Sequence, residues 1–497
     1  MEPLRTAPAL SEARSPANGN GKSSKTYPAI IQGGMGAGVS GWRLANAVAR
    51  AGQMGVVSGT AMDLILARRL QDGDPGGHMR RALDRFPVPE IAGRLLARYF
   101  IPGGKGPAVP YKAIPRYCAQ PRKTLLELAL AANFAEVWLA KEGHPGPVGI
   151  NLLEKIQLPN LASLYGAMLA GVDFVLMGAG IPREIPGILD RLSRHEAASL
   201  RLSVAGALKD ESFQMRFAPR DLIPGDLPPL TRPKFLAIVS SYTLALTLMK
   251  KSTGRVDGFV IERPTAGGHN APPRGPLQLD ENGEPLYGPK DDVDLSQIKE
   301  LGLPFWVGGS CAAPETLRDM RDRGAAGVQV GTLFAFCEES NLAPDIKRAV
   351  CRMAARGEGS VFTDPVASPT RFPFKVVQLE GSMSGKEVYA ARPRMCDMGY
   401  LREVYRRGDG TLGYRCPAEP VEDYVKKGGK LEETEGRKCL CNGLFANIGH
   451  PQVRKDGYRE RPLVTSGDDL NRIARFLADG KPSYTAREVI RYLVGEG

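Results

Sequence analysis

The sequence of 497 residues has no long apolar run, few cysteines and no concentrated tract of charge. No stretch reaches the roughly 18 apolar residues that a bilayer-spanning helix needs, so no transmembrane segment is expected. Eight cysteines in a chain of this length do not suggest a secreted disulfide scaffold. The first residues also lack the apolar core of a signal peptide. We therefore expect residues 1–27 to be a disordered leader and the protein to be cytoplasmic.

The charge is basic but dispersed, with 66 Lys and Arg against 54 Asp and Glu. This distribution predicts a solvated surface that favours anionic ligands rather than a nucleic-acid footprint. A composition of 42% hydrophobic and 24% charged residues is typical of a folded chain with a sizeable core. We expect a small-molecule substrate and no nucleic-acid or membrane partner, and the oligomeric state is left open.

Short apolar runs alternate with helical patterns from residue 28 to about residue 355, as in βα units that carry a parallel sheet. Eight strands are predicted, at residues 28–32, 55–58, 148–152, 174–177, 235–240, 258–262, 304–307 and 327–331. Eight such strands with intervening helices indicate a (β/α)8 TIM barrel, an α/β fold whose active site lies at the carboxyl ends of the strands.

Two further regions flank or interrupt this pattern. A helical insertion is predicted over residues 63–142, where we expect it to cover one end of the sheet. We assign residues 28–375 to the barrel and residues 376–497 to a small C-terminal extension packed on it. The extension is richer in proline, glycine and charge, and it contains two predicted helices at residues 468–477 and 486–493.

The loop after the first strand is rich in glycine and begins Gln32-Gly33-Gly34-Met35. Residues 36–41 satisfy the G-x-G-x-x-G pattern of a dinucleotide fold. That fold needs an acidic residue near the end of the second strand to hold a ribose, whereas this strand ends in Val57-Ser58. The barrel is therefore favoured, and the glycines let backbone N–H groups approach a flat ligand.

The last two strands end in sequences typical of phosphate loops. The seventh is followed by Gly308-Gly309-Ser310, before Pro314 opens a helix, and the eighth leads into Gln329-Val330-Gly331-Thr332. Phosphates in barrels commonly sit on the loops after these two strands. Glycine amides and Ser or Thr hydroxyls can donate to phosphate oxygens, so the pair predicts an anion site, with ordinary tight turns as the alternative.

A histidine follows the sixth strand. His269 comes directly after Gly267-Gly268, while the other four histidines have no comparable setting. An imidazole at the barrel mouth can act as an acid, a base or a hydrogen-bond donor near neutral pH. We predict that His269 is catalytic, with a structural histidine as the alternative.

These motifs carry a family resemblance. Residues 28–375 resemble the flavin-mononucleotide-dependent barrels that include nitronate monooxygenases (2-nitropropane dioxygenases) and flavin-dependent enoyl-acyl-carrier-protein reductases. The matching motifs are IIQGGM (30–35), GINL (149–152), AGGH (266–269), VGGS (307–310), VQVGTLF (328–334) and ESN (339–341). The chain is also similar to reductase subunits of polyunsaturated fatty-acid synthases, which belong to the same superfamily.

The resemblance implies a bound flavin mononucleotide (FMN). Its phosphate would lie on the two phosphate loops, and its isoalloxazine would lie against residues 33–35 with Asn151 in hydrogen-bond reach. The cofactor-binding residues implied are Gln32, Gly33, Gly34, Met35, Asn151, Gly178, Gly268, Gly308, Gly309, Ser310, Gln329, Gly331 and Thr332.

The resemblance leaves the reaction open. Nitronate monooxygenases carry a histidine base just after strand four, and this chain has residues 178–182, Gly-Ala-Gly-Ile-Pro, which resemble a turn of the enoyl reductases. A preformed nitronate needs no deprotonation, so the leading expectation is oxidation of a nitronate with dioxygen. The alternatives are an NAD(P)H-dependent enoyl-thioester reductase, in which His269 matches the active-site histidine, and a non-catalytic flavin-binding partner of a biosynthetic assembly.

Four cysteines of the extension form a candidate metal site. Four thiolates are the usual set for structural zinc. Cys439 and Cys441 are the only close pair among them, and the common C-x-x-C spacing is absent, so buried apolar thiols are the alternative. The candidate ligands are Cys396, Cys416, Cys439 and Cys441.

Overall fold

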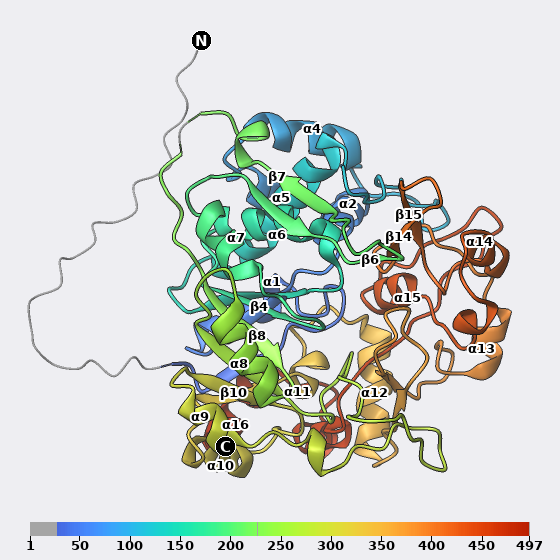
Figure 1. Ribbon diagram of the computed structural model, residues 1–497. Coiled ribbons are helices and arrows are strands. Elements are labelled where there is room, and N and C mark those ends of the chain that lie inside the picture. The colour runs from blue at the N-terminus through green and yellow to red at the C-terminus, as the bar shows by residue number, and fades with distance from the viewer. Residues whose placement is uncertain (1–26, 226, 497) are drawn as a thin grey trace, which may run out of the picture.

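A computed structural model of the protein describes residues 27–225 and 227–496 (Figure 1). The predicted leader, residues 1–27, lies outside the described residues except for its last position. All eight predicted strands are present, with ends within two residues of those expected. They are β1 (Ile30–Gln32), β2 (Gly55–Ser58), β3 (Val148–Leu153), β4 (Phe174–Gly178), β8 (Lys234–Val239), β9 (Gly258–Glu262), β10 (Phe305–Gly308) and β11 (Gly327–Val330).

These strands form one parallel sheet that closes into a barrel. The strand order is β1-β11-β10-β9-β8-β4-β3-β2, and β1 meets β2 through Met54. The N–H of Gln32 donates to the carbonyl of Met54 at 2.9 Å, and the N–H of Met54 donates to Ile30 at 3.0 Å. Buried side chains fill the interior, Trp306 and Phe174 being the largest. The predicted TIM barrel is confirmed, and because its centre is packed, a ligand must bind at the rim.

Helices surround the barrel, and one of them lies within the segment predicted to be an insertion. We expected residues 63–142 to be an insertion, but α5 (Lys123–Lys141) packs between the barrel helices α1 (Trp42–Arg50) and α6 (Gln157–Leu169). Fourteen of its nineteen residues are buried, as in a helix covered on all sides. The insertion proper therefore comprises the helices α2 (Met62–Gln71), α3 (His78–Leu83) and α4 (Pro89–Tyr99) and the segment that follows them.

The remaining barrel helices lie in the later βα units. They are α7 (Ile185–Leu192), α8 (Tyr242–Lys251), α9 (Leu295–Glu300), α10 (Pro314–Asp322), α11 (Thr332–Ala335) and α12 (Pro344–Ala355). A two-stranded sheet of β5 (Ala198–Arg201) and β7 (Gln214–Phe217) and short 3₁₀ turns η1 (Pro219–Asp221) and η2 (Pro289–Asp291) occupy the connections. Proline at the start of α10 and α12 suits the first helical turn, where an N–H has no intrahelical partner.

The chain after the barrel returns to it in several places. β12 (Val361–Asp364) and β13 (Phe374–Val377) form a hairpin, and β14 (Glu403–Arg406) with β15 (Leu412–Arg415) extends a sheet begun by β6 (Val204–Ala205). The other elements are α13 (Lys386–Ala391), α14 (Val421–Lys426), η3 (Leu431–Thr434), α15 (Leu440–Asn447), η4 (Leu470–Gly480) and α16 (Ala486–Val494). The predicted helix at residues 486–493 is confirmed, whereas the one at 468–477 is a 3₁₀ helix.

The extension shares its core with the barrel. One hydrophobic cluster runs from Ile30 of β1 to Leu493 of α16, and α16 contacts both α1 and α10. The insertion is tied to the extension by Asp63, whose buried carboxylate accepts hydrogen bonds from the hydroxyls of Tyr117 and Tyr400. Among the described residues, no helix combines the length and apolar character required to cross a membrane.

Candidate functional site

A large cavity opens at the carboxyl ends of the barrel strands and encloses about 1720 Å³, including its mouth. The loops after β1, β2, β3, β4, β9, β10 and β11 all contribute to its wall. The structure thus brings together residues from seven loops that are far apart in the sequence. The predicted site residues that line it are Gly33, Gly34, Met35, Asn151, Gly178, Gly268, His269, Gly308, Gly309, Ser310, Gln329, Gly331 and Thr332.

Of the predicted catalytic and cofactor-binding residues, Gln32 is the one that does not line this cavity. Its side chain is fully buried, its Oε1 accepts from the N–H of Val56 at 3.0 Å, and its Nε2 donates to the Ser40 hydroxyl at 2.9 Å. The Ser40 hydroxyl in turn accepts from the N–H of Met35 at 2.9 Å. Gln32 therefore fixes the first loop against β2 rather than presenting a group to a ligand.

Within the described chain, four buried side-chain oxygens of cavity-lining residues have no hydrogen-bond partner. They are Oδ1 of Asn151, Oε1 of Gln329, Oγ1 of Thr265 and Oδ1 of Asn447. The Asn151 side chain is held in place because its Nδ2 donates to the carbonyl of Gly34 at 3.0 Å. Buried polar atoms without partners are rare in native proteins, so these four indicate that a polar ligand completes the site.

The loops after β10 and β11 present backbone donors to the cavity. Within the described chain, the N–H groups of Gly309, Ser310 and Gly331 donate to no other protein group. A Cβ atom on Gly331 would meet only Met35, at 3.4 Å from its sulfur, so the glycine leaves open space beside these amides. Convergent free amides with no side chain in front of them are typical of an anion site.

Backbone strain is concentrated around this cavity. Six non-glycine residues of the described chain have positive φ, and three of them, Ala61, Ala179 and Ser310, line the cavity. Such conformations are costly for residues with a Cβ atom and gather at functional sites, where the surroundings enforce them. The strain at Ser310 turns the chain directly after the predicted phosphate loop.

The C-terminal segment completes the cradle, which the sequence did not predict. Thr465, Ser466, Gly467 and Asp469 line the cavity beside the barrel loops. The N–H of Gly467 donates to the Thr332 hydroxyl at 3.0 Å, and the N–H of Gly268 donates to the Thr465 hydroxyl at 3.0 Å. The only local signal was the hydroxyl and glycine content of residues 465–467, which matches that of the two phosphate loops.

Burial disfavours the charged forms of the ionisable groups in the cavity. Burial raises the pKa of Glu262 to about 7 and lowers that of His269 to about 4. Burial also raises the pKa of Asp469. No Lys or Arg is present among the described residues that line the cavity. The site therefore has no fixed positive charge apart from its backbone donors.

The apolar side of the cavity is built in equal parts by the barrel and the extension. Its residues come from the end of β3 and the loop after it, from the region around α15, and from positions 342 and 401. The residues are Leu152, Leu153, Ile156, Leu342, Leu401, Leu440, Leu444 and Phe445. An extended apolar group can be desolvated along this side while its polar end remains near the barrel loops.

The four candidate metal ligands gather around one small cavity, lined by Cys396, Cys416, Cys439 and Cys441. All four thiols are free. However, no group of three His, Cys, Asp or Glu side chains in the described chain is arranged so that it could hold a metal ion. The fold brings the four cysteines together although they are far apart in the sequence, but the zinc prediction gains no support.

Comparisons with known proteins give only distant structural likeness. No family model matches the chain, and no curated protein matches it. Solved structures include FabK from Thermotoga maritima, which is 14% identical, with 95% of this chain and 93% of that chain covered and a TM-score of 0.48.

Two other structures give similar values. A nitroalkane oxidase from Streptomyces ansochromogenes is 14% identical, with 94% of this chain and 95% of that chain covered and a TM-score of 0.46. The enoyl reductase domain of MlnA, from the macrolactin biosynthesis cluster of Bacillus amyloliquefaciens, is 10% identical, with 94% and 93% covered and a TM-score of 0.45. Likeness at this level carries no argument about function, and the barrel is established by its own strand pairing.

Proposed function

We propose that this chain is an FMN-dependent oxidoreductase that reduces the carbon–carbon double bond of an enoyl thioester. The observation that supports a bound cofactor is the set of hydrogen-bond donors and acceptors without partners in one cavity. Free amides at Gly309, Ser310 and Gly331 suit a phosphate, and unpartnered side-chain oxygens of Asn151 and Gln329 suit the N–H groups of a flat heterocycle.

Each part of the cavity has a distinct role in the proposed reaction. The loops after β10 and β11 would hold the phosphate, and Gly33, Gly34 and Asn151 would contact the ring system. Bound FMN supplies the hydride chemistry. His269, a neutral imidazole in the cavity, acts as the donor of a hydrogen bond or a proton to the substrate. The apolar side of the cavity takes the acyl chain and excludes water from it.

The charge of the cavity favours a neutral substrate. A nitronate is an anion, and apart from the amides assigned to the phosphate, the described lining offers no cation to receive it. Placing an unpaired anion against apolar walls costs several kcal/mol, on the order of the penalty for a buried unpaired charge. Nitronate oxidation, the leading expectation from the sequence motifs, stays a prediction, and the same experiment tests it.

Anaerobic stopped-flow absorbance separates these reactions. We expect NADPH or NADH to bleach the bound flavin and a trans-2-enoyl thioester with a long acyl chain to restore the colour. Propionate 3-nitronate, added without nicotinamide nucleotide, should leave the flavin oxidised. Bleaching by the nitronate would instead support the monooxygenase, and no response to any of these compounds would support a non-catalytic flavin-binding protein.

His269→Ala tests the catalytic assignment. We expect turnover to fall by roughly 10²–10⁴-fold while the flavin remains bound, because the imidazole is the donor and not part of the cradle. Flavin content from the visible spectrum is the control. Unchanged turnover would remove His269 from the reaction.

A further inference from the structure

The imidazole of His269 is fixed by a serine from a distant part of the chain. Its Nε2 lies 2.7 Å from the hydroxyl of Ser368, which belongs to the connection between β12 and β13 and is fully buried. The ring of Phe374 packs against the imidazole with 4.9 Å between centroids. Within the described chain no protein atom bonds Nδ1, so this nitrogen is the one available to a molecule in the cavity.

The hydroxyl of Ser368 has a second partner on its other side. The hydroxyl of Thr370 lies 2.8 Å away, and the N–H of Thr370 donates to the same Ser368 oxygen at 3.2 Å. A hydroxyl has one proton to donate, so Ser368 gives it either to His269 or to Thr370. Thr370 is half-buried and precedes the exposed Arg371, so the series of groups leads from the cavity toward solvent.

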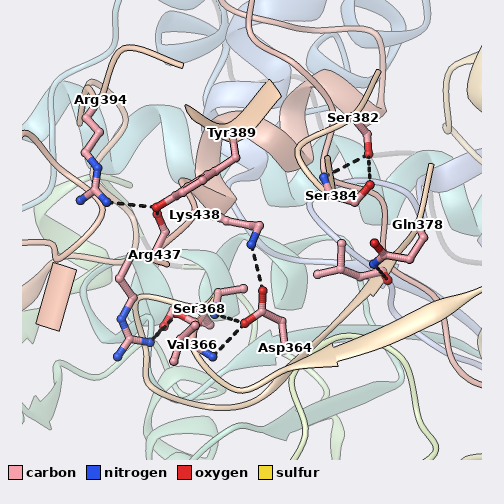
Figure 2. A network of polar contacts seen from close by, with 12 residues as sticks. Asp364, Val366, Ser368, Gln378, Ser382, Ser384, Tyr389, Arg394, Arg437 and Lys438 are labelled. Carbon is pink, nitrogen blue, oxygen red and sulfur yellow. Dashed lines mark hydrogen bonds and ion pairs between the residues drawn. The ribbon is translucent and has the colours of Figure 1, made fainter. Parts of the chain in front are cut away.

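The loop that carries Ser368 is bonded to side chains of neighbouring segments, as Figure 2 shows. Nη1 of Arg437 donates to the carbonyls of Ser368 at 2.6 Å and Val366 at 2.7 Å. The carboxylate of Asp364 accepts from the N–H of Val366 at 2.9 Å and from Nζ of Lys438 at 2.9 Å. These contacts keep the hydroxyl at one distance from the imidazole, which a proton transfer between them requires.

His269 is poorly suited to store a proton. Burial lowers its pKa to about 4, so the imidazolium is a minor form at neutral pH. A neutral imidazole that gives a proton from Nδ1 must therefore receive another at Nε2 in the same event. Ser368 is the group in contact with Nε2.

We propose that His269, Ser368 and Thr370 form a proton relay from solvent to the cavity. The proposal rests on the proposed enoyl-thioester reduction. In that reaction one alkene carbon accepts a hydride from the reduced cofactor and the other takes the proton of Nδ1. Nε2 takes the proton of Ser368, Ser368 takes that of Thr370, and Thr370 takes one from water. The π bond is replaced by two C–H bonds, one solvent proton is consumed, and the imidazole remains neutral.

Thr370→Val tests the relay, because it removes the hydroxyl and keeps the shape of the side chain. In stopped-flow experiments with the flavin-bound protein, we expect reoxidation by the enoyl thioester to slow by roughly 10–100-fold. Reduction of the flavin by NADPH should be unchanged, since it needs no proton from His269. Thr370→Ser should restore reoxidation to near the wild-type rate, and the solvent deuterium isotope effect of this half-reaction should change only in Thr370→Val.

A second hydroxyl pair in the same region provides a matched control. The hydroxyls of Ser382 and Ser384 lie 2.9 Å apart (Figure 2), and both donate to the carbonyl of Leu379. Within the described chain, neither hydroxyl bonds the imidazole of His269. Ser384→Ala should leave both half-reactions unchanged. The relay is wrong if Thr370→Val reoxidises at the wild-type rate, if it slows both half-reactions alike, or if Thr370→Ser fails to rescue.

Nitrogen-15 NMR of the histidine ring separates the relay from the proposed function. The Ser368 contact should hold the neutral ring of flavin-bound protein in a single tautomer, and Ser368→Ala should give a mixture of tautomers. Identical spectra would overturn the Ser368 link whatever the substrate. If no enoyl thioester reoxidises the wild-type flavin, the proposed function fails, while the ring spectra still decide whether Ser368 sets the imidazole.

Discussion

The barrel loops and the C-terminal segment build the same cavity from opposite kinds of residue. The loops after β10 and β11 offer glycines and free backbone amides, whereas the region around α15 offers leucines and a phenylalanine. The loop at residues 465–469 joins the two, because Gly467 and Thr465 bond groups of the barrel loops. On the proposed function, this difference assigns cofactor recognition mainly to the barrel, and enclosure of the site and selection of the substrate to the later segment.

The largest effect is expected where a barrel glycine faces the anion site. Gly331→Val should yield colourless protein, with flavin affinity reduced by at least roughly 1,000-fold, because the side chain would occupy the space beside the free amides. Gly93→Val is the matched control, since a Cβ atom at Gly93 would meet no atom within 4 Å. Retained stoichiometric flavin in Gly331→Val would break the assignment of cofactor recognition to the barrel.

The next effect concerns the buried acid of the barrel rim. Glu262 has its pKa raised from its ordinary 4.5 to about 7, so its stabilising contribution is complete below pH 4.5 and is lost as the pH rises through 7. Between pH 4.5 and 7.5, the free energy of unfolding of flavin-free Glu262→Gln should therefore rise by about 3 kcal/mol relative to that of wild type. Denaturant unfolding at both pH values measures it, and a constant difference would contradict the prediction.

The variant must be compared with wild type at each pH because the contribution of His269 to stability has the opposite dependence on pH. Its pKa is lowered from 6.5 to about 4, so its contribution is present above pH 6.5 and is lost as the pH falls through 4. The two groups offset one another between these values. Only the difference between variant and wild type isolates Glu262.

A smaller effect is expected at the junction of the two regions. A Cβ atom on Gly467 would lie 2.9 Å from the carbonyl oxygen of Thr265 and 3.1 Å from the N–H nitrogen of Gly267. Gly467→Ala should therefore displace the loop and weaken flavin binding by about 10-fold, or about 1.4 kcal/mol. Gly288→Ala, where a Cβ atom meets nothing within 4 Å, is the control. Equal flavin affinity would show that the later segment has no part in the cradle.

The smallest effect is expected at Lys375, which holds the junction from β13. Its buried Nζ contacts Asp468 Oδ1 at 2.8 Å and Thr363 Oγ1 at 2.8 Å. Because Asp468 is largely exposed, Lys375→Met leaves no buried charge unpaired, and flavin affinity should fall only about 3-fold. Flavin titration by fluorescence quenching measures this change, and a loss as large as that of Gly331→Val would contradict the proposed division.

The barrel was predictable from the sequence because its strands are buried on both faces. Such strands read as short apolar runs, and their carboxyl ends carry the glycines that mark the cavity, as at Gly308-Gly309-Ser310. Gln32 shares the same run of sequence but points away from the cavity. Its side chain bonds Val56 and Ser40, and no local pattern distinguishes that role from ligand binding.

The enclosing segment was not predictable because its contacts join residues 99 to 200 positions apart. Gly467 meets Thr332 and Gly267, and Ser368 meets His269, yet no periodicity encodes either pair. The sequence predicts a helix at residues 468–477 but not its type. Leu470, Ile473 and Leu477 recur at i, i+3 and i+7, which is typical of an α-helix face, whereas η4 is a 3₁₀ helix with three residues per turn.

The loop at residues 465–469 has a consequence for how the protein matures. Because the cavity is lined both by the barrel loops and by residues 465–469, synthesis must pass residue 469 before its wall is complete. A nascent barrel on the ribosome would therefore present the free amides of the loops after β10 and β11 without the segment that covers them. On the proposed function, tight binding of the coenzyme is expected to be a late event in biogenesis.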